Sequence, residues 1–275
     1  MASWMPRSFD PPDAASVGTV RTQIARVAEA GFAFENGRRL PSLRVAFETY
    51  GVSMGGFQAA EWAVAFPDFA DRIVIDRGTF RAPDLLVATT EARTLAIRSD
   101  PYWREGRYAD EGVFPRAGMT IAGMILHLYA TSQEAFTSTF GRRITEAGPS
   151  PYESLGGRFA SAAALREAGE AFAASGIDPN AYLYNIRAIA LHDVSHGCGS
   201  LEAAAGRVRA RVLFFHCRSD LLVPVAGARE AHGVLRAAGV TTEFYEYDHP
   251  LGHLALSTPA LRARWLPVLR DFLKD

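Results

Sequence analysis

The sequence GVSMGG at residues 51–56 constrains the fold of this chain more than any other stretch. The pattern G-x-S-x-G is typical of a nucleophile elbow, a sharp strand-to-helix turn that presents a serine at the rim of a sheet. Such a turn needs small residues on both sides of the serine, because its backbone is strained and a neighbouring segment comes close. Gly51 and Gly55 meet that need around Ser53. The pattern alone is weak, since short glycine–serine matches are often ordinary flexible loops.

The residues that follow favour the elbow over the loop. Residues 57–66 contain good helix formers without glycine or proline, and Pro67 ends the run. Residues 72–75, with the sequence RIVI, then suit a buried strand. A helix that begins just after Ser53 would direct its N-terminal N–H groups at a developing acyl oxyanion. The Met54 N–H is therefore the candidate oxyanion donor.

Composition limits the class of protein. The 275-residue chain, with 48% hydrophobic residues, can bury a large core as one domain with an insertion. Its net charge of −1 and the lack of a long basic run argue against nucleic acid or an anionic membrane as partner. Cys198 and Cys217 lack metal-ligand spacing and are too few for a disulfide framework. Without an apolar run of membrane-spanning length, we predict a cytoplasmic protein that needs no metal or cofactor.

Strands and helices alternate in the first and last parts of the chain, which favours a mainly parallel α/β sheet. In the last third we expect a strand at residues 211–217 and another at 243–247. Helices are expected after these strands and in the middle of the chain, at residues 82–98, 118–130, 133–140, 159–174, 180–192, 224–238 and 259–273.

The helical middle predicts a lid over a site, although these helices could equally well just enlarge the core. The predicted organisation is an N-terminal tail at residues 1–30, an α/β core at residues 31–98 and 201–275, and a helical lid or cap insertion at residues 99–200.

The stretch before the elbow conflicts with that architecture. Residues 32–34 and 43–50 flank Asn36-Gly37, which predicts a β-hairpin, and the second arm alternates apolar and polar side chains. A strand that enters a nucleophile elbow is normally buried in a parallel sheet and apolar on both faces. Either the sheet is built in an unusual way or an internal segment is absent, and we predict that the N-terminal part of the sheet is missing. Residues 21–30 are expected to form a short helix or to continue the tail.

Two residues in the last third complete the chemistry of the serine. Asp220 follows the strand predicted at 211–217, and His253 follows the strand predicted at 243–247. Catalytic groups of open α/β sheets gather at the carboxyl ends of the strands. Ser53 would attack an acyl carbonyl, His253 would take and return its proton, and Asp220 would orient the imidazole. Separately, Asp220 could be a turn or helix-cap residue, and a loop histidine is usually just exposed.

The other histidines give weaker signals. His192 and His196 have the i, i+4 spacing that holds zinc on a helix, but the glutamate of the metalloprotease motif is absent. Gly197 also indicates that the helix has ended, so we predict no metal site. His216 lies in an apolar strand and is expected to be a hydrogen-bonded core residue.

Taken together, the motifs resemble those of the homoserine O-acetyltransferase family, which has the α/β-hydrolase fold. Residues 43–51 resemble the family's N-terminal hairpin, residues 51–69 its nucleophile region and residues 178–184 a lid-helix signature. Asp220 and His253 match the acid and base positions. The resemblance implies a Ser-His-Asp triad, a covalent acyl-enzyme, a helical lid and often a homodimer. Acetyl-CoA or another acyl donor would be a substrate.

Three departures from the family pattern matter. The family places a long segment between hairpin and elbow, with the second oxyanion N–H, whereas here the two are joined directly. Losing one oxyanion donor typically lowers turnover about 10²–10³-fold. Leu254 occupies the place of an aspartate that holds the substrate amine, and Gly123 that of an arginine that pairs with the substrate carboxylate. An uncharged residue cannot replace an ion pair to a zwitterionic amino acid.

These departures favour an internally shortened, hydrolase-like member of the family. The predicted function is that of a serine acyl-transfer enzyme, an ester hydrolase or O-acyltransferase acting on a small ester or thioester. Two alternatives stay open: a homoserine O-acetyltransferase of methionine biosynthesis, and a shortened, catalytically inactive family member.

Overall fold

The computed structural model describes residues 23–28, 32–33, 39–40, 43–47, 50–146, 148–257 and 259–273 of the 275-residue chain. Residues Tyr50–Ala255 form one compact unit, and residues Met1–Thr49 with Leu256–Asp275 form another.

The described part of the smaller unit contains two pairs of antiparallel strands and a helix. Strand β1 pairs with β4, and β2 pairs with β3. The elements are β1 (Gln23–Ala28), β2 (Phe32–Ala33), β3 (Arg39–Leu40), β4 (Leu43–Phe47) and α9 (Pro259–Leu273).

The pairing corrects two predictions. The arm at 43–50 was expected to pair with residues 32–34, but β4 pairs with β1, and residues 32–33 pair with 39–40. Asn36-Gly37 lies outside the described residues. Strand β1 also occupies the stretch expected to be a short helix or tail. A helix of about ten residues is marginal in water, so pairing with a neighbouring strand overrides its weak propensity.

The larger unit is built on a four-stranded parallel sheet in the order β5-β6-β7-β8. Its strands are β5 (Tyr50–Val52), β6 (Arg72–Asp76), β7 (Arg211–Cys217) and β8 (Thr242–Tyr247). The inner strands β6 and β7 are buried along almost their whole length, which is why their sequences are nearly continuous apolar runs. The predicted mainly parallel α/β class is confirmed.

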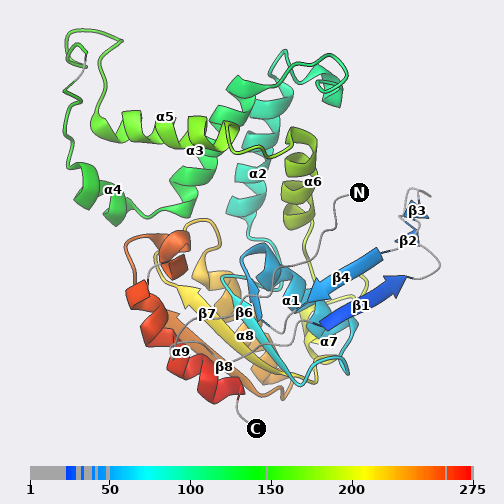
Figure 1. The fold of residues 1–275 in the computed structure, drawn as a ribbon. Coiled ribbons are helices and arrows are strands. Elements are labelled where there is room, and N and C mark those ends of the chain that lie inside the picture. The colour runs from blue at the N-terminus through cyan, green and yellow to red at the C-terminus, as the bar shows by residue number, and fades with distance from the viewer. Residues whose placement is uncertain are drawn as a thin grey trace. The chain divides into compact units, whose positions relative to one another are not determined.

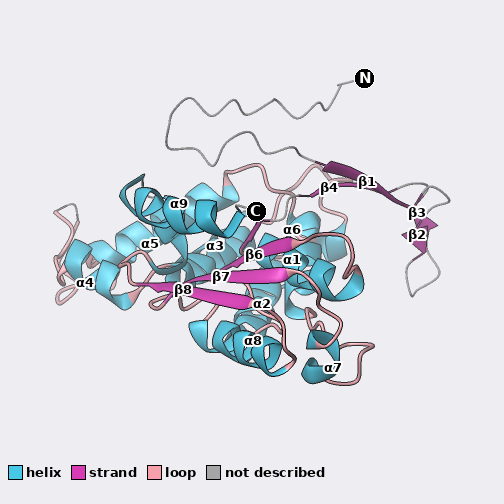
Figure 2. Ribbon diagram, turned by 90° about the horizontal axis from the view of Figure 1, so that it is seen from below, coloured by secondary structure: helices cyan, strands magenta, loops and turns pink. Residues whose placement is uncertain are grey.

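Three helices share a core with one face of this sheet: α1 (Met54–Ala65), α7 (Leu201–Ala205) and α8 (Val225–Ala237). Figure 2 shows α7 and α8 on the same side of the strands. This core includes small alanines from all three helices, packed together with Ile75 and Phe214 from the strands. Small side chains let the helices pack closely against the sheet. The close packing of α1 places the turn that precedes it beside the ends of the strands.

The remaining helices form a block above the strands in Figure 1. They are α2 (Asp84–Arg98), η1 (Arg104–Gly106), α3 (Arg116–Ala130), α4 (Gln133–Phe140), α5 (Ala160–Ala173) and α6 (Pro179–Ala190). Helices α2, α3, α5 and α6 share an apolar cluster of their own around Met119 and Ile186. The predicted lid boundaries at residues 99 and 200 stay a prediction. No helix among the described residues is long and apolar enough to cross a membrane.

A further apolar cluster joins this block to α1 and to the loop after β7. It contains Phe57 of α1, Leu86 of α2, Ala130 of α3, and Leu222 and Val223 from the loop after β7. The helices therefore lie over the carboxyl ends of the strands, where the predicted catalytic residues are.

Candidate active site

Ser53 occupies the turn between β5 and α1, as the motif predicts. Its backbone has φ 56° and ψ −117°, a conformation that a residue other than glycine adopts only under strain. Backbone hydrogen bonds hold it there. The Ser53 N–H donates to the Asp76 carbonyl at 2.8 Å, and the Gly56 N–H donates to the Ser53 carbonyl at 2.8 Å. The strained turn is thus tied to the end of β6.

The glycines of the motif differ in their surroundings. A Cβ atom on Gly51 would lie 1.9 Å from the Gly55 carbonyl oxygen, so only glycine fits at position 51. A Cβ on Gly55 would meet no atom of the described residues within 4 Å, whereas one on Gly56 would lie 3.1 Å from the Gly78 Cα. The prediction that Gly55 is required for close approach is therefore wrong. It is Gly56 that faces the segment after β6.

The structure brings Ser53, His253 and Asp220 together. His253 Nε2 lies 2.8 Å from Ser53 Oγ, and His253 Nδ1 lies 2.7 Å from Asp220 Oδ2. Asp220 is only 2% exposed and His253 only 8% exposed. His253 sits in η2 (Gly252–Ser257), the 3₁₀ turn after β8, and Asp220 sits in the loop after β7. The three side chains thus reach one another from the carboxyl ends of three parallel strands.

The hydrogen bonds of Asp220 determine which nitrogen of His253 donates and which accepts. Its Oδ1 accepts from the Leu222 N–H and the Val223 N–H, both at 2.9 Å. Because a carboxylate oxygen accepts, His253 Nδ1 donates to Asp220 Oδ2, and Nε2 is left to accept from the Ser53 hydroxyl. This is the tautomer that a general base for Ser53 requires. The same two N–H bonds hold the loop of Asp220 in a turn. Asp220 is therefore a turn residue, as considered from the sequence, as well as the partner of His253.

The oxyanion side of the site is less enclosed. Met54 is the first residue of α1, so its N–H is among the four that an α-helix leaves without an intrahelical acceptor. Within residues 50–255, β5 pairs with β6 alone and is therefore an edge strand. Val52 is 40% exposed and Met54 is also exposed. Among the described residues, this arrangement offers the Met54 N–H as oxyanion donor.

The two positions that depart from the family pattern carry no charge in the structure. Leu254 directly follows His253 and is exposed. Gly123 is buried in α3, and a Cβ there would lie 2.5 Å from the Phe172 Cβ of α5. Position 123 is therefore a point of close helix packing, and an arginine there would have to displace Phe172.

Sequence reasoning missed two charged residues beside the site. Asp76 is the last residue of β6 and Arg77 directly follows it, and both are buried. Arg77 Nε donates to Asp76 Oδ1 at 2.9 Å, and Arg77 Nη1 donates to the His253 carbonyl oxygen. Their signal in the sequence is a pair of opposite charges directly after the apolar run 73–75, at the carboxyl end of a buried strand. A charge at such a place is expected to be paired.

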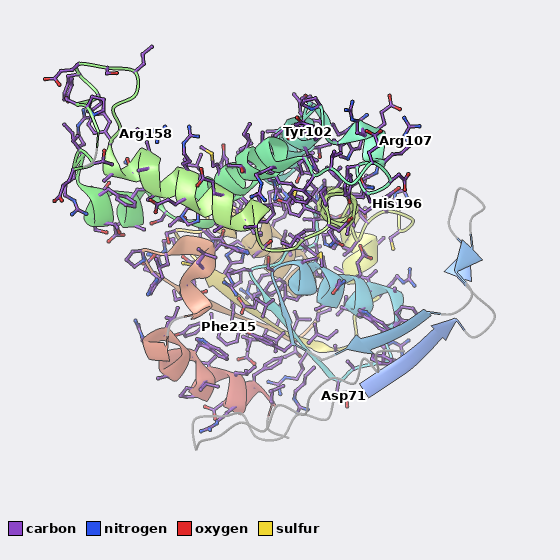
Figure 3. All side chains as sticks on the ribbon, turned by 45° about the horizontal axis from the view of Figure 1, so that its top comes forward. Asp71, Tyr102, Arg107, Arg158, His196 and Phe215 are labelled. Atoms are coloured by element: carbon purple, nitrogen blue, oxygen red, sulfur yellow. The ribbon has the colours of Figure 1, made fainter. Side chains whose placement is uncertain are left out.

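His192 and His196 have different surroundings beyond the end of α6. His192 is buried beyond the end of α6, where its Nε2 bonds the Thr79 carbonyl at 2.8 Å and its Nδ1 lies 3.1 Å from Glu61 Oε1. His196 lies in the exposed turn after α6 (Figure 3). The described residues contain no group of three or more histidine, cysteine or acidic side chains that could hold a metal ion.

The hydrogen bonding of His216 differs from what the sequence predicts. It is completely buried in β7, but its Nε2 has no hydrogen-bond partner among the described residues. The expectation of a hydrogen-bonded core residue is therefore wrong for this nitrogen. Burial lowers the pKa of His216 to about 4, although the nearby Asp220 opposes the change.

Known proteins of similar sequence are acetyltransferases. The chain is 36% identical over 203 residues to a homoserine O-acetyltransferase from Deferribacter desulfuricans, which is 74% of this chain and 53% of that protein. It is 35% identical over 224 residues to one from Geotalea daltonii, 82% of this chain and 59% of that protein. The chain thus spans between about half and three-fifths of the length of these relatives. No family model matches the chain.

Solved structures of similar fold include both transferases and esterases. The homoserine O-acetyltransferase from Bacillus anthracis gives a TM-score of 0.74 at 27% identity, over 82% of this chain and 59% of that chain. Esterase E22 gives 0.72 at 27% identity, over 82% and 60%. The acetyl esterase MekB gives 0.66 at 26% identity, over 82% and 61%. The resemblance inferred from the motifs is confirmed, and so is the α/β-hydrolase-like fold.

Proposed function

We propose that this chain, a homologue of the homoserine O-acetyltransferases with an α/β-hydrolase-like fold, is a serine acyl-transfer enzyme. The observation that carries the proposal is the continuous chain of hydrogen bonds from Ser53 Oγ through His253 to Asp220. Further support comes from the strained backbone of Ser53 at the start of α1.

The reaction proceeds in two halves on the same three side chains. His253 Nε2 takes the Ser53 hydroxyl proton as Ser53 Oγ attacks the acyl carbonyl carbon, and the carbonyl oxygen becomes an oxyanion. The imidazolium then returns the proton to the leaving alcohol or thiol, and an acyl-Ser53 ester is left. In the second half, His253 deprotonates water or an acceptor alcohol, which attacks this ester. The Ser53 Oγ–acyl bond then breaks, and the imidazolium returns the proton to Ser53 Oγ. Asp220 stabilises the imidazolium in both halves.

The Met54 N–H and the N-terminal end of α1 stabilise the oxyanion. The Met54 N–H is the donor identified among the described residues, and a site with one donor turns over about 10²–10³-fold more slowly than a site with two. We therefore expect a slow enzyme with an intact proton relay.

The acceptor follows from positions 123 and 254. Neither Gly123 nor Leu254 offers a charge to a zwitterionic amino acid, and Phe172 fills the space beside Gly123. We propose an uncharged acceptor, water or a small alcohol, and a small ester or thioester such as acetyl-CoA as acyl donor. The names of the structural neighbours, which include an esterase and an acetyl esterase, are consistent with such an acceptor. The reaction requires no cofactor or metal.

Labelling with a fluorophosphonate probe tests the nucleophile. We expect the purified protein to be labelled at Ser53, and Ser53→Ala to abolish both labelling and hydrolysis of p-nitrophenyl acetate. Ser99→Ala, at an exposed serine after α2, is the matched control and should be labelled like the parent protein. If the folded parent protein is not labelled, the chain is a catalytically inactive relative.

A parallel assay separates the acceptors. Homoserine acetylation from acetyl-CoA is measured beside p-nitrophenyl acetate hydrolysis on the same protein. We expect hydrolysis to exceed homoserine acetylation. Homoserine turnover faster than hydrolysis would overturn the uncharged acceptor and favour a homoserine O-acetyltransferase of methionine biosynthesis, while leaving the role of Ser53 intact.

A further inference from the structure

We propose that Asp76 and Arg77 position the nucleophile and the base relative to each other, as a buried link between the turn at Ser53 and the main chain of His253. This role rests on the proposed function of Ser53 and His253. Asp76 and Arg77 are called the Asp76–Arg77 clamp below.

The backbone of the clamp connects the strands that lead into the site. The Asp76 carbonyl accepts from the Ser53 N–H at 2.8 Å, and the Arg77 N–H donates to the Phe215 carbonyl of β7 at 2.9 Å. Both residues lie at the end of the inner strand β6, between β5 and β7. The clamp thus holds the nucleophile turn against the strand that leads to Asp220.

The side chain of Arg77 extends the link to the base. Arg77 has φ 50°, in the left-handed region that a residue other than glycine enters only with backbone strain. Its guanidinium donates through Nη1 to the His253 carbonyl and through Nε to Asp76 Oδ1. The guanidinium can bond two acceptors at once because its donors form a rigid, planar fork.

Tyr50 completes the clamp from the strand before the nucleophile. Its hydroxyl donates to Asp76 Oδ2 at 2.5 Å. Burial raises the pKa of Tyr50, and the Asp76 charge adds to this effect, so the hydroxyl keeps the proton that it donates. Asp76 is completely buried, and both its carboxylate oxygens have partners. Such a carboxylate is stabilised by charge-assisted hydrogen bonds rather than by water.

The main chain of His253 needs such an anchor. His253 lies in a 3₁₀ turn beyond the end of β8, so the hydrogen bonds of the sheet do not fix it. Its ring must remain near 2.8 Å from Ser53 Oγ for proton transfer. A displacement of about 1 Å in a catalytic site can lower turnover about 10²-fold. Because Arg77 binds the carbonyl of His253 and not its ring, it sets the position of the base without taking part in the proton relay.

The test compares Arg77→Met with the double variant Asp76→Asn/Arg77→Met. Arg77→Met leaves a buried carboxylate without its cation and is expected to destabilise the protein. The double variant removes both charges and leaves no unpaired buried charge. Its effect on kcat therefore reports the loss of the bond that positions His253. We expect it to melt within a few degrees of the parent protein while kcat for p-nitrophenyl acetate falls about 10²-fold with little change in KM. A folded double variant with the kcat of the parent protein overturns the proposal.

Two further variants complete the design. Arg81→Met removes an exposed arginine that pairs with Glu230 at 2.7 Å, and it should leave kcat unchanged. Tyr50→Phe removes the hydroxyl that donates to Asp76 and is expected to lower kcat about 3–10-fold, in line with the net contribution of a single hydrogen bond. If the double variant does not fold, Tyr50→Phe decides, and an unchanged kcat for it overturns the proposal.

A spectroscopic measurement tests the positioning role of the clamp independently of the proposed acyl-transfer function. In the parent protein, the His253 Nδ1–H that donates to Asp220 should give a low-field proton resonance that is absent from His253→Ala. We expect this resonance to broaden or vanish in the double variant and to persist in Arg81→Met. If the resonance behaves in this way but the probe does not label Ser53, the acyl-transfer function is wrong and the clamp is still supported. A resonance unchanged in the double variant would sink the clamp alone.

Discussion

The two ends of the hydrogen-bond chain from Ser53 to Asp220 are supported in different ways. Asp220 follows β7, an inner strand that is buried from Val212 to Cys217, and its carboxylate is held by two backbone N–H groups. Ser53 follows β5, which has three residues and is an edge strand within residues 50–255. The acid end therefore extends from a long, buried inner strand, whereas the serine end depends on one strained turn that a backbone hydrogen bond ties to β6.

This difference predicts two kinds of failure. At the acid end, a substitution can disable the proton relay while the buried strands keep the fold. At the serine end, a substitution in the turn acts on the backbone itself, so stability and activity should fall together.

The largest expected effect is at the acid end. Asp220→Asn should lower kcat for p-nitrophenyl acetate about 10⁴-fold, because the amide favours the wrong imidazole tautomer and cannot stabilise the imidazolium. The melting temperature should change much less than the activity. Asp178→Asn is the matched control, since Asp178 caps α6 through the Ala181 N–H and should leave kcat within about twofold. A loss below tenfold in Asp220→Asn would contradict the assigned role.

The next effect is at the serine end. Gly51→Ala places a methyl group 1.9 Å from the Gly55 carbonyl oxygen. Because this oxygen belongs to the backbone, the clash can be relieved only by moving the main chain. We expect a loss of about 4 kcal/mol in the free energy of unfolding, measured by urea denaturation, together with loss of probe labelling. Gly55→Ala is the paired variant. It meets open space among the described residues and should change stability by no more than about 1 kcal/mol, in the stabilising direction. Equal effects of the two substitutions would refute this account of the turn.

The smallest of these effects concerns His216, buried in β7 near the acid end. Its pKa is lowered by burial to about 4 in the folded protein, from 6.5 in the unfolded chain. Between these values the unfolded chain binds a proton that the folded protein does not, so stability is lost as the pH falls from about 6.5 to about 4. The loss should be on the order of 3 kcal/mol across this window, since one pKa unit is worth about 1.4 kcal/mol.

Urea denaturation at pH 7 and pH 4.5 checks the His216 prediction. The parent protein should lose more stability between the two values than His216→Gln, which carries no titrating group at that position. Carboxyl groups elsewhere contribute equally to both proteins, so the difference between them isolates His216. The same loss in both proteins would show that His216 does not titrate as expected.

Elements with strong local signals were predicted from the sequence with little error. The helix at 133–140, the strand at 211–217 and the helix at 259–273 are confirmed residue for residue. The approach of Ser53, Asp220 and His253 was also foreseen, because the rule that groups gather at the carboxyl ends of parallel strands depends on strand order alone. Helix α7 was not predicted, since five residues after a capping serine give too short a periodic signal.

The failures share one cause. The partner of β4, the crowding of Gly56 rather than Gly55, and the missing bond of His216 Nε2 all depend on which distant segment lies beside a residue. No local pattern encodes such a neighbour, because propensity and periodicity describe a segment alone.

The sequence by itself determined the α/β class, the strained serine turn and the three residues of the proposed relay, because each is written in the order of elements along the chain. Only the tertiary structure revealed that Asp76 and Arg77 join the turn at Ser53 to the backbone of His253. That link joins residues 176 positions apart in the chain. Their pairing depends on burial and on the packing of β5, β6 and β7, so it exists only once the sheet has formed.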